Sequence, residues 1–284
     1  MVFTCFFMGA RLPAVAGSFY PSSKRGIEAM LSRFAAECNP FESGAVKAVV
    51  APHAGWVYSG KTAFHSFKAL KQACEREKGV RPVFVIVCPN HSGTGAPVAL
   101  SMENWLTPLG EAKCSQKVAA SVLTHSEFVV VDESAHEREH SAEVQLPFLQ
   151  YFFKENFEFA AIALLRQDFV VARDLAKSIL MASREAGEKV FVVASSDFTH
   201  YEPRRRARAK DEHAIEALLE LDSKEFLKRV DEEGVSACGP GAVVTAAEYA
   251  RLAGARKGTL LDFSDSGRVS GEDSVVDYAS IAFQ

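Results

Sequence analysis

The chain has 284 residues, 48% of them hydrophobic, and a formal net charge of -4 at pH 7. This length is sufficient for a full hydrophobic core, and α/β folds often run to about 250 residues as one domain. The mildly acidic balance is untypical of a dedicated nucleic-acid binder, which would carry a net basic face. We therefore expect a globular protein with no nucleic acid among its partners.

Residues 1–10 are apolar but lack the basic start of a signal peptide, and no later run approaches the roughly 18 apolar residues of a membrane span. We interpret 1–10 as an N-terminal extension and 11–284 as the domain. A disulfide framework is untypical of a chain of this size, and no C-x-x-C pair is present. We expect a cytoplasmic location, no membrane partner and six reduced thiols: Cys5, Cys38, Cys74, Cys88, Cys114 and Cys238.

Short apolar segments alternate with longer amphipathic ones along the chain. The segments that read as buried strands are 45–51, 83–88, 128–131, 159–165, 190–194 and 278–283. The segments with helical apolar spacing are 23–37, 61–77, 170–186, 204–221 and 242–252. Alternation of this kind predicts a single α/β domain with a mostly parallel, mixed central sheet flanked by helices.

Three of the predicted strands are followed by a turn that carries a histidine. His53 follows the first strand, His91 follows the second, and the turn after segment 190–194 carries Asp197 and His200. In open parallel sheets, ligands bind beyond the carboxyl ends of the strands. A single histidine of this kind is more often a turn residue, but three of them together indicate convergence on one site.

Two further residues are candidates for the same site. His140 precedes Ser141 and Glu143, which resemble the start of a helix, where the helix dipole disfavours an imidazolium. The alternative for His140 is a solvated, charged loop. Cys238 precedes Gly239 and a predicted helix, a position that favours a thiolate, although a buried structural cysteine is an equally good interpretation.

Other features receive a structural interpretation. We expect structural roles for His65 and His213 on helices, for His125 on a loop, and for His136. The basic run 204–208 is most simply a solvated helix face that could attract an anion. The sequence contains no Walker P-loop, no G-x-G-x-x-G after a strand and no G-x-S-x-G elbow. Nucleotide binding and serine-hydrolase chemistry therefore have no support.

Seven segments together resemble the Memo family, named after the mediator of ErbB2-driven cell motility and called AmmeMemoRadiSam system protein B in prokaryotes. They are RLPAVAGSFYP (11–21), APHAGWVYSG (51–60), PNH (89–91), EHSAE (139–143), SSDFTH (195–200), CG (238–239) and SGEDSVVDYASIAF (270–283). The resemblance covers nearly the whole chain from Arg11 onward. It implies a fold like that of the class III extradiol dioxygenases of the LigB group, in which two histidines and a glutamate hold Fe(II).

The resemblance also implies roles for individual residues. His53 and His91 match the two histidine ligands, and Cys238 stands where a carboxylate ligand is expected. Asp197 and His200 match the acid/base position, and His140 is a second histidine of the same site. A cysteine ligand departs from the facial triad of non-haem iron enzymes, which leaves dioxygenase activity open. In a second departure, Gln145 stands where the family often has a histidine before Leu-Pro.

Two functions follow from these assignments. One is a redox enzyme that holds Fe(II), or copper, and acts on a small oxidisable molecule, with His140, Asp197 and His200 handling protons. The other is a binding module that uses the same residues for a peptide or an anion, as proposed for phosphotyrosine peptides in the animal member. The prokaryotic family name also implies a radical SAM protein and an AMMECR-like protein as partners; any iron–sulfur cluster would belong to them, since this chain has no such motif.

Overall fold

The computed structural model describes residues 10–38, 42, 44–76 and 81–284. Residues 1–9 of the predicted N-terminal extension, Cys5 among them, and residue 77 at the end of a predicted helix lie outside this part of the chain. No helix in the described part combines the length and the apolar character that crossing a bilayer requires.

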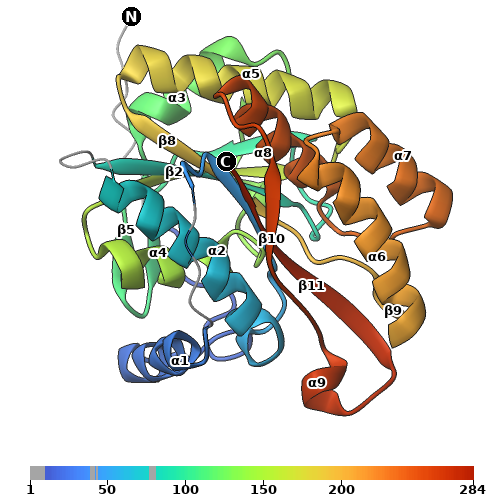
Figure 1. The fold of residues 1–284 in the computed structure, drawn as a ribbon. Helices are drawn as coiled ribbons and strands as arrows, with labels where there is room; N and C mark the ends of the chain where they lie inside the picture. Colours follow the sequence, from blue (N-terminus) through green and yellow to red (C-terminus); the bar gives the residue numbers. More distant parts are fainter. Residues whose placement is uncertain (1–9, 39–41, 43, 77–80) are drawn as a thin grey trace, which may run out of the picture.

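Within the described residues, a nine-stranded sheet runs through the centre of the molecule in the order β10-β11-β1-β8-β2-β7-β3-β6, with β9 paired to β11 (Figure 1). The strands are β1 (Ala48–Ala51), β2 (Pro82–Pro89), β3 (Val98–Ser101), β6 (Val130–Val131), β7 (Glu158–Leu164), β8 (Lys189–Ser195), β9 (His200–Pro203), β10 (Gly258–Asp265) and β11 (Ser274–Phe283). Strands β1, β8, β2 and β7 are parallel neighbours, whereas β11, β10 and β9 pair antiparallel and β3 runs antiparallel to β7. The predicted single domain with a mostly parallel, mixed sheet is confirmed. Strands β4 (Trp105–Thr107) and β5 (Gly110–Ala112) form a separate hairpin.

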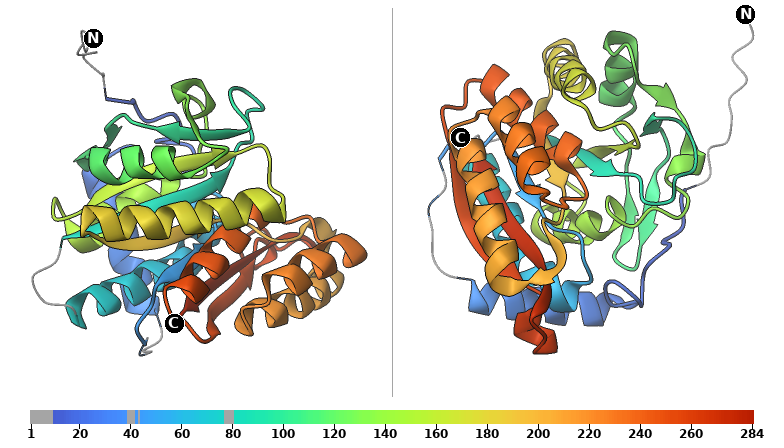
Figure 2. Two further views of the ribbon diagram at one scale, coloured as in Figure 1. Left: turned by 90° about the horizontal axis from the view of Figure 1, so that it is seen from above. Right: turned by 90° about the vertical axis from the view of Figure 1, so that its right-hand side faces the viewer.

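Helices cover both faces of this sheet (Figures 1 and 2). One face carries α1 (Lys24–Glu37), α2 (Trp56–Arg76) and α4 (Leu146–Phe153). The other carries α3 (Gln116–His125), α5 (Phe169–Ala186), α6 (Arg204–Leu219), α7 (Ser223–Glu233) and α8 (Pro240–Leu252). The short helix α9 (Gly267–Ser270) lies between β10 and β11.

Alternate residues of the central strands serve two separate cores. In β2, Val83, Val85 and Val87 pack under the α5–α8 side, whereas Phe84 and Ile86 pack under the α2–α4 side. All five are essentially inaccessible to solvent. A strand buried on both faces loses the polar–apolar alternation of a half-exposed strand, which explains why these segments read as continuous apolar runs.

One predicted strand is wrong in extent and burial. Segment 128–131 was expected to be a buried strand, but only the two residues of β6 pair, and both are about half exposed. Because β6 pairs only with β3, at the edge of the sheet, it has little to cover it. The predicted helices exist within the described residues with shifted ends, whereas α3, α7 and α9 were not predicted. The helix start predicted at Ser141 and Glu143 is a 3₁₀ turn, Glu143–Gln145, that leads into α4.

Candidate metal centre

The candidate site forms where three adjacent parallel strands end. His53 follows β1, His91 follows β2, and Asp197 follows β8, which lies between them in the sheet. The register of β1 and β8 pairs Ala51 with Ser195, so the turns after these strands start at the same level. Of the three histidines predicted to converge here, His53 and His91 come together, whereas His200 lies outside the group of ring nitrogens.

Three imidazole rings meet at this edge. One ring nitrogen from each of His53, His91 and His140 lies within 4.8 Å of the other two. The rings of His91 and His140 stack with centroids 4.6 Å apart, and the ring of His53 stands edge-on to both, at 5.1 and 5.4 Å. Their side chains are 2% exposed for His53, 19% for His140 and 36% for His91, so the cluster reaches solvent on the His91 side.

Burial keeps two of these rings neutral. The pKa of His53 is held well below its usual value by burial and then by the neighbouring His140 and His91 rings. Burial lowers the pKa of His140 to about 4, although the Glu139 carboxylate opposes the shift. The predicted helix N-terminus is a 3₁₀ turn, Glu143–Gln145, and burial is the first cause of the lowered His140 pKa. Neutral imidazoles are the form that binds transition metals.

A buried carboxylate orients two of the three rings. Glu139 Oε1 lies 2.9 Å from His91 Nδ1 and 3.3 Å from His140 Nδ1, and it accepts a hydrogen bond from Ser141 N–H. Its second oxygen, Oε2, accepts a hydrogen bond from His91 N–H. Burial alone would raise the pKa of Glu139, but the His91 and Ser141 hydrogen bonds hold it well below its usual value. An ionised carboxylate on Nδ1 leaves the opposite ring nitrogen, Nε2, of His91 to bind a ligand.

Asp197 lies in the turn after β8 and contacts His53. Its Oδ1 accepts a hydrogen bond of 2.7 Å from His53 N–H, and its Oδ2 lies 4.0 Å from His53 Nε2. Burial raises the pKa of Asp197 to about 6, with the hydrogen bond from His53 N–H acting in the opposite direction. The carboxyl group therefore lies beside the imidazole cluster with a pKa close to neutrality, which suits a group that exchanges protons.

Cys238 lies directly before Gly239, the N-cap of α8, as the sequence predicted. Its Sγ is 3.1 Å from His53 Nε2 and accepts a hydrogen bond of 3.1 Å from Asp197 N–H. Cys238 is not in the group that the three ring nitrogens form. Of the two interpretations left open by the sequence, the electrostatic surroundings favour a protonated, buried thiol over a thiolate. Burial and then the Asp197 carboxylate raise the pKa of the Cys238 thiol, and the hydrogen bond from Asp197 N–H acts in the opposite direction.

His200 stands at the margin of the site. Its Nδ1 contacts Ser236 O at 2.9 Å, and its backbone N–H donates to Ser236 Oγ. A carbonyl oxygen can only accept, so Nδ1 carries a proton, and Nε2 has no hydrogen bond to a described residue. The His200 ring interacts electrostatically with both His53 and Asp197. The residue is thus near the cluster without belonging to the three-nitrogen group.

The histidines outside the site have structural partners, as expected. His65 Nδ1 contacts Lys61 O, His136 Nε2 contacts Ala99 O, and His213 contacts Glu233. His125 also pairs with a carboxylate, at 2.8 Å from Glu185, but it ends α3 and does not lie on the predicted loop.

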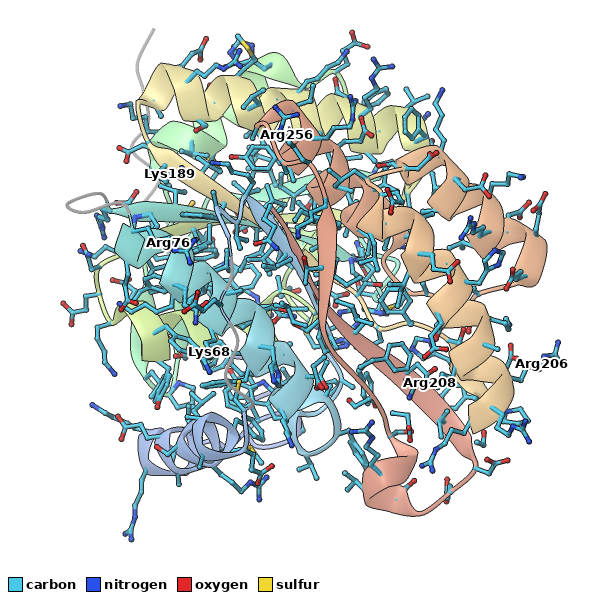
Figure 3. All side chains as sticks on the ribbon, in the orientation of Figure 1. Lys68, Arg76, Lys189, Arg206, Arg208 and Arg256 are labelled. Atoms are coloured by element: carbon cyan, nitrogen blue, oxygen red, sulfur yellow. The ribbon has the colours of Figure 1, made fainter. Side chains whose placement is uncertain are left out.

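The basic run at the start of α6 is largely neutralised. Arg204 pairs with Asp265, Arg206 with Glu202, and Arg208 with Glu212. Figure 3 shows Arg206 pointing away from α6 into solvent, and its side chain is 72% exposed. The run is therefore mainly a solvated helix face.

The segment that follows Arg11 forms a wall beside His140. Glu143, at the start of the 3₁₀ turn Glu143–Gln145, is fully buried and accepts hydrogen bonds from the Arg11 guanidinium, the Tyr20 hydroxyl and the backbone N–H groups of residues 14 and 15. Phe19 then packs against the His140 ring with centroids 4.5 Å apart. This contact places the segment after Arg11 beside the site, although the two are far apart in sequence.

Glu139 and Ser195 are functional residues that the sequence patterns do not predict. Ser195 Oγ lies 2.8 Å from His53 Nδ1, so it partners the third ring as Glu139 partners the other two. The sequence signals were weak: Glu139 precedes a candidate histidine, and Ser195 ends a buried strand. Neither position shows which ring it contacts.

The fold and the site define an α/β protein with a three-histidine cluster that could hold a metal ion at the carboxyl edge of its parallel strands. A family model described as "Memo-like protein" matches residues 11–282. A "MEMO1 family protein" of Archaeoglobus fulgidus is 42% identical over 274 residues, which cover 96% of this chain and 99% of that protein. A MEMO1 family protein of Thermoplasma acidophilum is 40% identical over 273 residues, covering 95% and 97%. The chain belongs to the Memo family.

A solved structure shares the fold at low sequence identity. It is an uncharacterized protein of Escherichia coli K12, with a TM-score of 0.52 and 13% identity, covering 84% of this chain and 100% of that one. At this identity the likeness concerns the fold alone.

Proposed function

We propose that this protein binds one transition-metal ion between His53 and His91, with His140 and Cys238 as the two further donors that flank this pair. The observation that carries the proposal is the approach of three ring nitrogens to within 4.8 Å of one another. Nitrogen and sulfur donors suit iron or copper, and we propose Fe(II) as the metal, by resemblance to the class III extradiol dioxygenases.

The surroundings of the cluster support this assignment. His53 and His91 each direct Nδ1 to a buried oxygen, from Ser195 and Glu139 respectively. This outer-shell pattern is typical of metal-binding histidines, because it fixes the ring and leaves Nε2 as the ligand atom. The 36% exposure of the His91 side chain supplies an entry route for the ion and for a substrate.

We further propose that the bound metal supports redox chemistry on a small oxidisable molecule. The metal would supply Lewis acidity and electron transfer. Asp197, with its pKa near 6, and His200, with a free Nε2, would accept or deliver protons at the margin of the site. Burial of His53 and Asp197 would keep water away from the inner side.

The experiment is metal analysis of protein purified without air and reconstituted with Fe(II), with copper in a parallel sample. We expect about one equivalent of metal in the wild type, none in His53→Ala or His91→Ala, and weaker binding in His140→Ala and Cys238→Ser. His65→Ala is the matched control, because His65 is equally buried but lies away from the cluster. A wild type that binds no metal would overturn the proposal and redirect the search to peptide and anion ligands. Unchanged affinity in Cys238→Ser would remove Cys238 from the ligand set.

A further inference from the structure

A chain of hydrogen bonds connects Gln145 to the ring of His53. Gln145 Nε2 lies 3.1 Å from Pro52 O and 2.8 Å from Ser195 Oγ. Ser195 Oγ lies 2.7 Å from Ser141 O and 2.8 Å from His53 Nδ1. Gln145, Ser141 and Ser195 are completely buried, and His53 is 2% exposed, so no solvent competes for these bonds.

The direction of each bond follows from the two backbone carbonyl groups, which can only accept. Pro52 O requires the Gln145 amide nitrogen, and not its oxygen, on that side. The opposite orientation would bring two acceptors together. Gln145 Oε1 has no hydrogen-bond partner among the described residues, so no donor near it favours a different orientation of the amide. The second Nε2 proton of Gln145 is then donated to Ser195 Oγ.

The hydroxyl of Ser195 has one proton to give. Ser141 O accepts it at 2.7 Å, and Gln145 already donates to one lone pair of Oγ. The remaining lone pair faces His53 Nδ1, which must therefore be protonated. If the hydroxyl instead donated to His53 Nδ1, the Ser141 carbonyl would lose this partner at a completely buried position.

We infer that Ser195, oriented by Gln145, is the positioning residue that keeps the proton of neutral His53 on Nδ1 and leaves Nε2 as the atom for a ligand. The metal-binding consequence rests on the proposed function, but the tautomer itself does not. Gln145 thereby has a role of its own at the position where the resemblance predicts a histidine. A neutral imidazole has one N–H, and so could not donate to both Pro52 O and Ser195 Oγ.

The test is the ¹⁵N spectrum of the histidine rings in the metal-free protein at neutral pH, which distinguishes a protonated from an unprotonated ring nitrogen. We expect wild-type His53 to show a protonated Nδ1 and an unprotonated Nε2. Ser195→Ala should move His53 toward the Nε2–H form, and Gln145→Met should produce a mixture. Gln150→Met is the matched control, since Gln150 is a buried glutamine of α4 whose partners are Thr107 and Gly110.

A wild-type His53 protonated on Nε2 would overturn the inference, as would an unchanged pattern in both variants. If Ser195→Ala fails to fold, the wild type and Gln145→Met decide. Fe(II) titration separates the two proposals: we expect about 10-fold weaker binding in Ser195→Ala, because Ser195 holds the ring of a proposed ligand in place without contacting the metal itself. A wild type with the expected tautomer but no metal affinity would overturn the proposed function and leave the positioning role intact.

Discussion

Asp277 on β11 lies directly opposite Asp265 on β10, so the two carboxyl groups project from the same face of the sheet. Like charges in this arrangement repel. Asp265 binds the Arg204 guanidinium, whereas neither carboxyl oxygen of Asp277 receives a hydrogen bond from a described residue. Burial, and then the nearby Asp211 carboxyl, raise the pKa of Asp277 to about 8, against a smaller opposing effect of Arg208. A protonated Asp277 can donate to Asp211.

Asp277→Asn should therefore stabilise the protein at alkaline pH. The pKa of Asp277 is higher in the folded state than the value of about 3.9 in the unfolded state. Between these two pKa values the folded wild type binds one proton more than the unfolded chain, so its free energy of unfolding falls as the pH rises toward 8. The stability gain of the variant should grow from pH 5 to pH 8.5 and reach at least about 1 kcal/mol. Chemical denaturation at several pH values measures it, with the exposed Asp273→Asn as control. A difference independent of pH would contradict a protonated Asp277.

Glu139→Gln should weaken both the fold and the site. The amide would present N–H groups to the His91 and Ser141 donors that the carboxylate now satisfies, at a cost of about 1 to 3 kcal/mol in the free energy of unfolding. Loss of the ring orientation should weaken metal binding by about 10- to 100-fold. Denaturation and metal titration measure the two effects. The exposed neighbour substitution Glu137→Gln should change neither, and wild-type behaviour of Glu139→Gln would exclude the orienting role.

Arg11→Met should be strongly destabilising. It leaves the Glu143 carboxylate, which is completely buried, without the guanidinium that contacts it at 2.7 Å. Removal of one partner from a buried ion pair costs about 3 to 5 kcal/mol. The exposed pair of Arg33 and Glu37 offers the comparison, since Arg33→Met should cost less than about 1 kcal/mol. Similar losses in the two variants would show that the Arg11 pair is no more than a surface contact.

Tyr201→Gly should stabilise the fold. Tyr201 is the extra residue in a bulge where β9 pairs with β11, and it adopts φ 58° with its side chain 80% exposed. The left-handed region costs about 1 to 2 kcal/mol for a residue with a Cβ, while glycine adds a smaller entropic cost. We expect a gain of about 0.5 to 1 kcal/mol, measured by thermal denaturation. Tyr201→Ala, which keeps the strain, should show no gain, and equal effects of the two would attribute the change to the ring.

Much of the fold could be predicted because buried parallel strands have a local signature. Strands β1, β2, β7 and β8 consist almost entirely of apolar residues, and their alternate residues fill two cores. Segment 128–131 shows the limit of this reasoning. Its apolar residues predicted burial, but burial depends on what lies beside a strand, and β6 lies at an edge.

The amino-acid sequence by itself determined the residue types, their order along the strands and the position of His53, His91 and Asp197 directly after strand ends. The tertiary structure alone decided that β8 lies between β1 and β2, which brings those turns together. It also decided which residue contacts each ring, namely Glu139 for His91 and Ser195 for His53. In addition, it placed the buried Asp197 beside Cys238. The physical reason is that hydrogen-bond geometry and desolvation depend on residues distant in sequence, so a local pattern can identify a candidate ligand but cannot set its orientation or its charge.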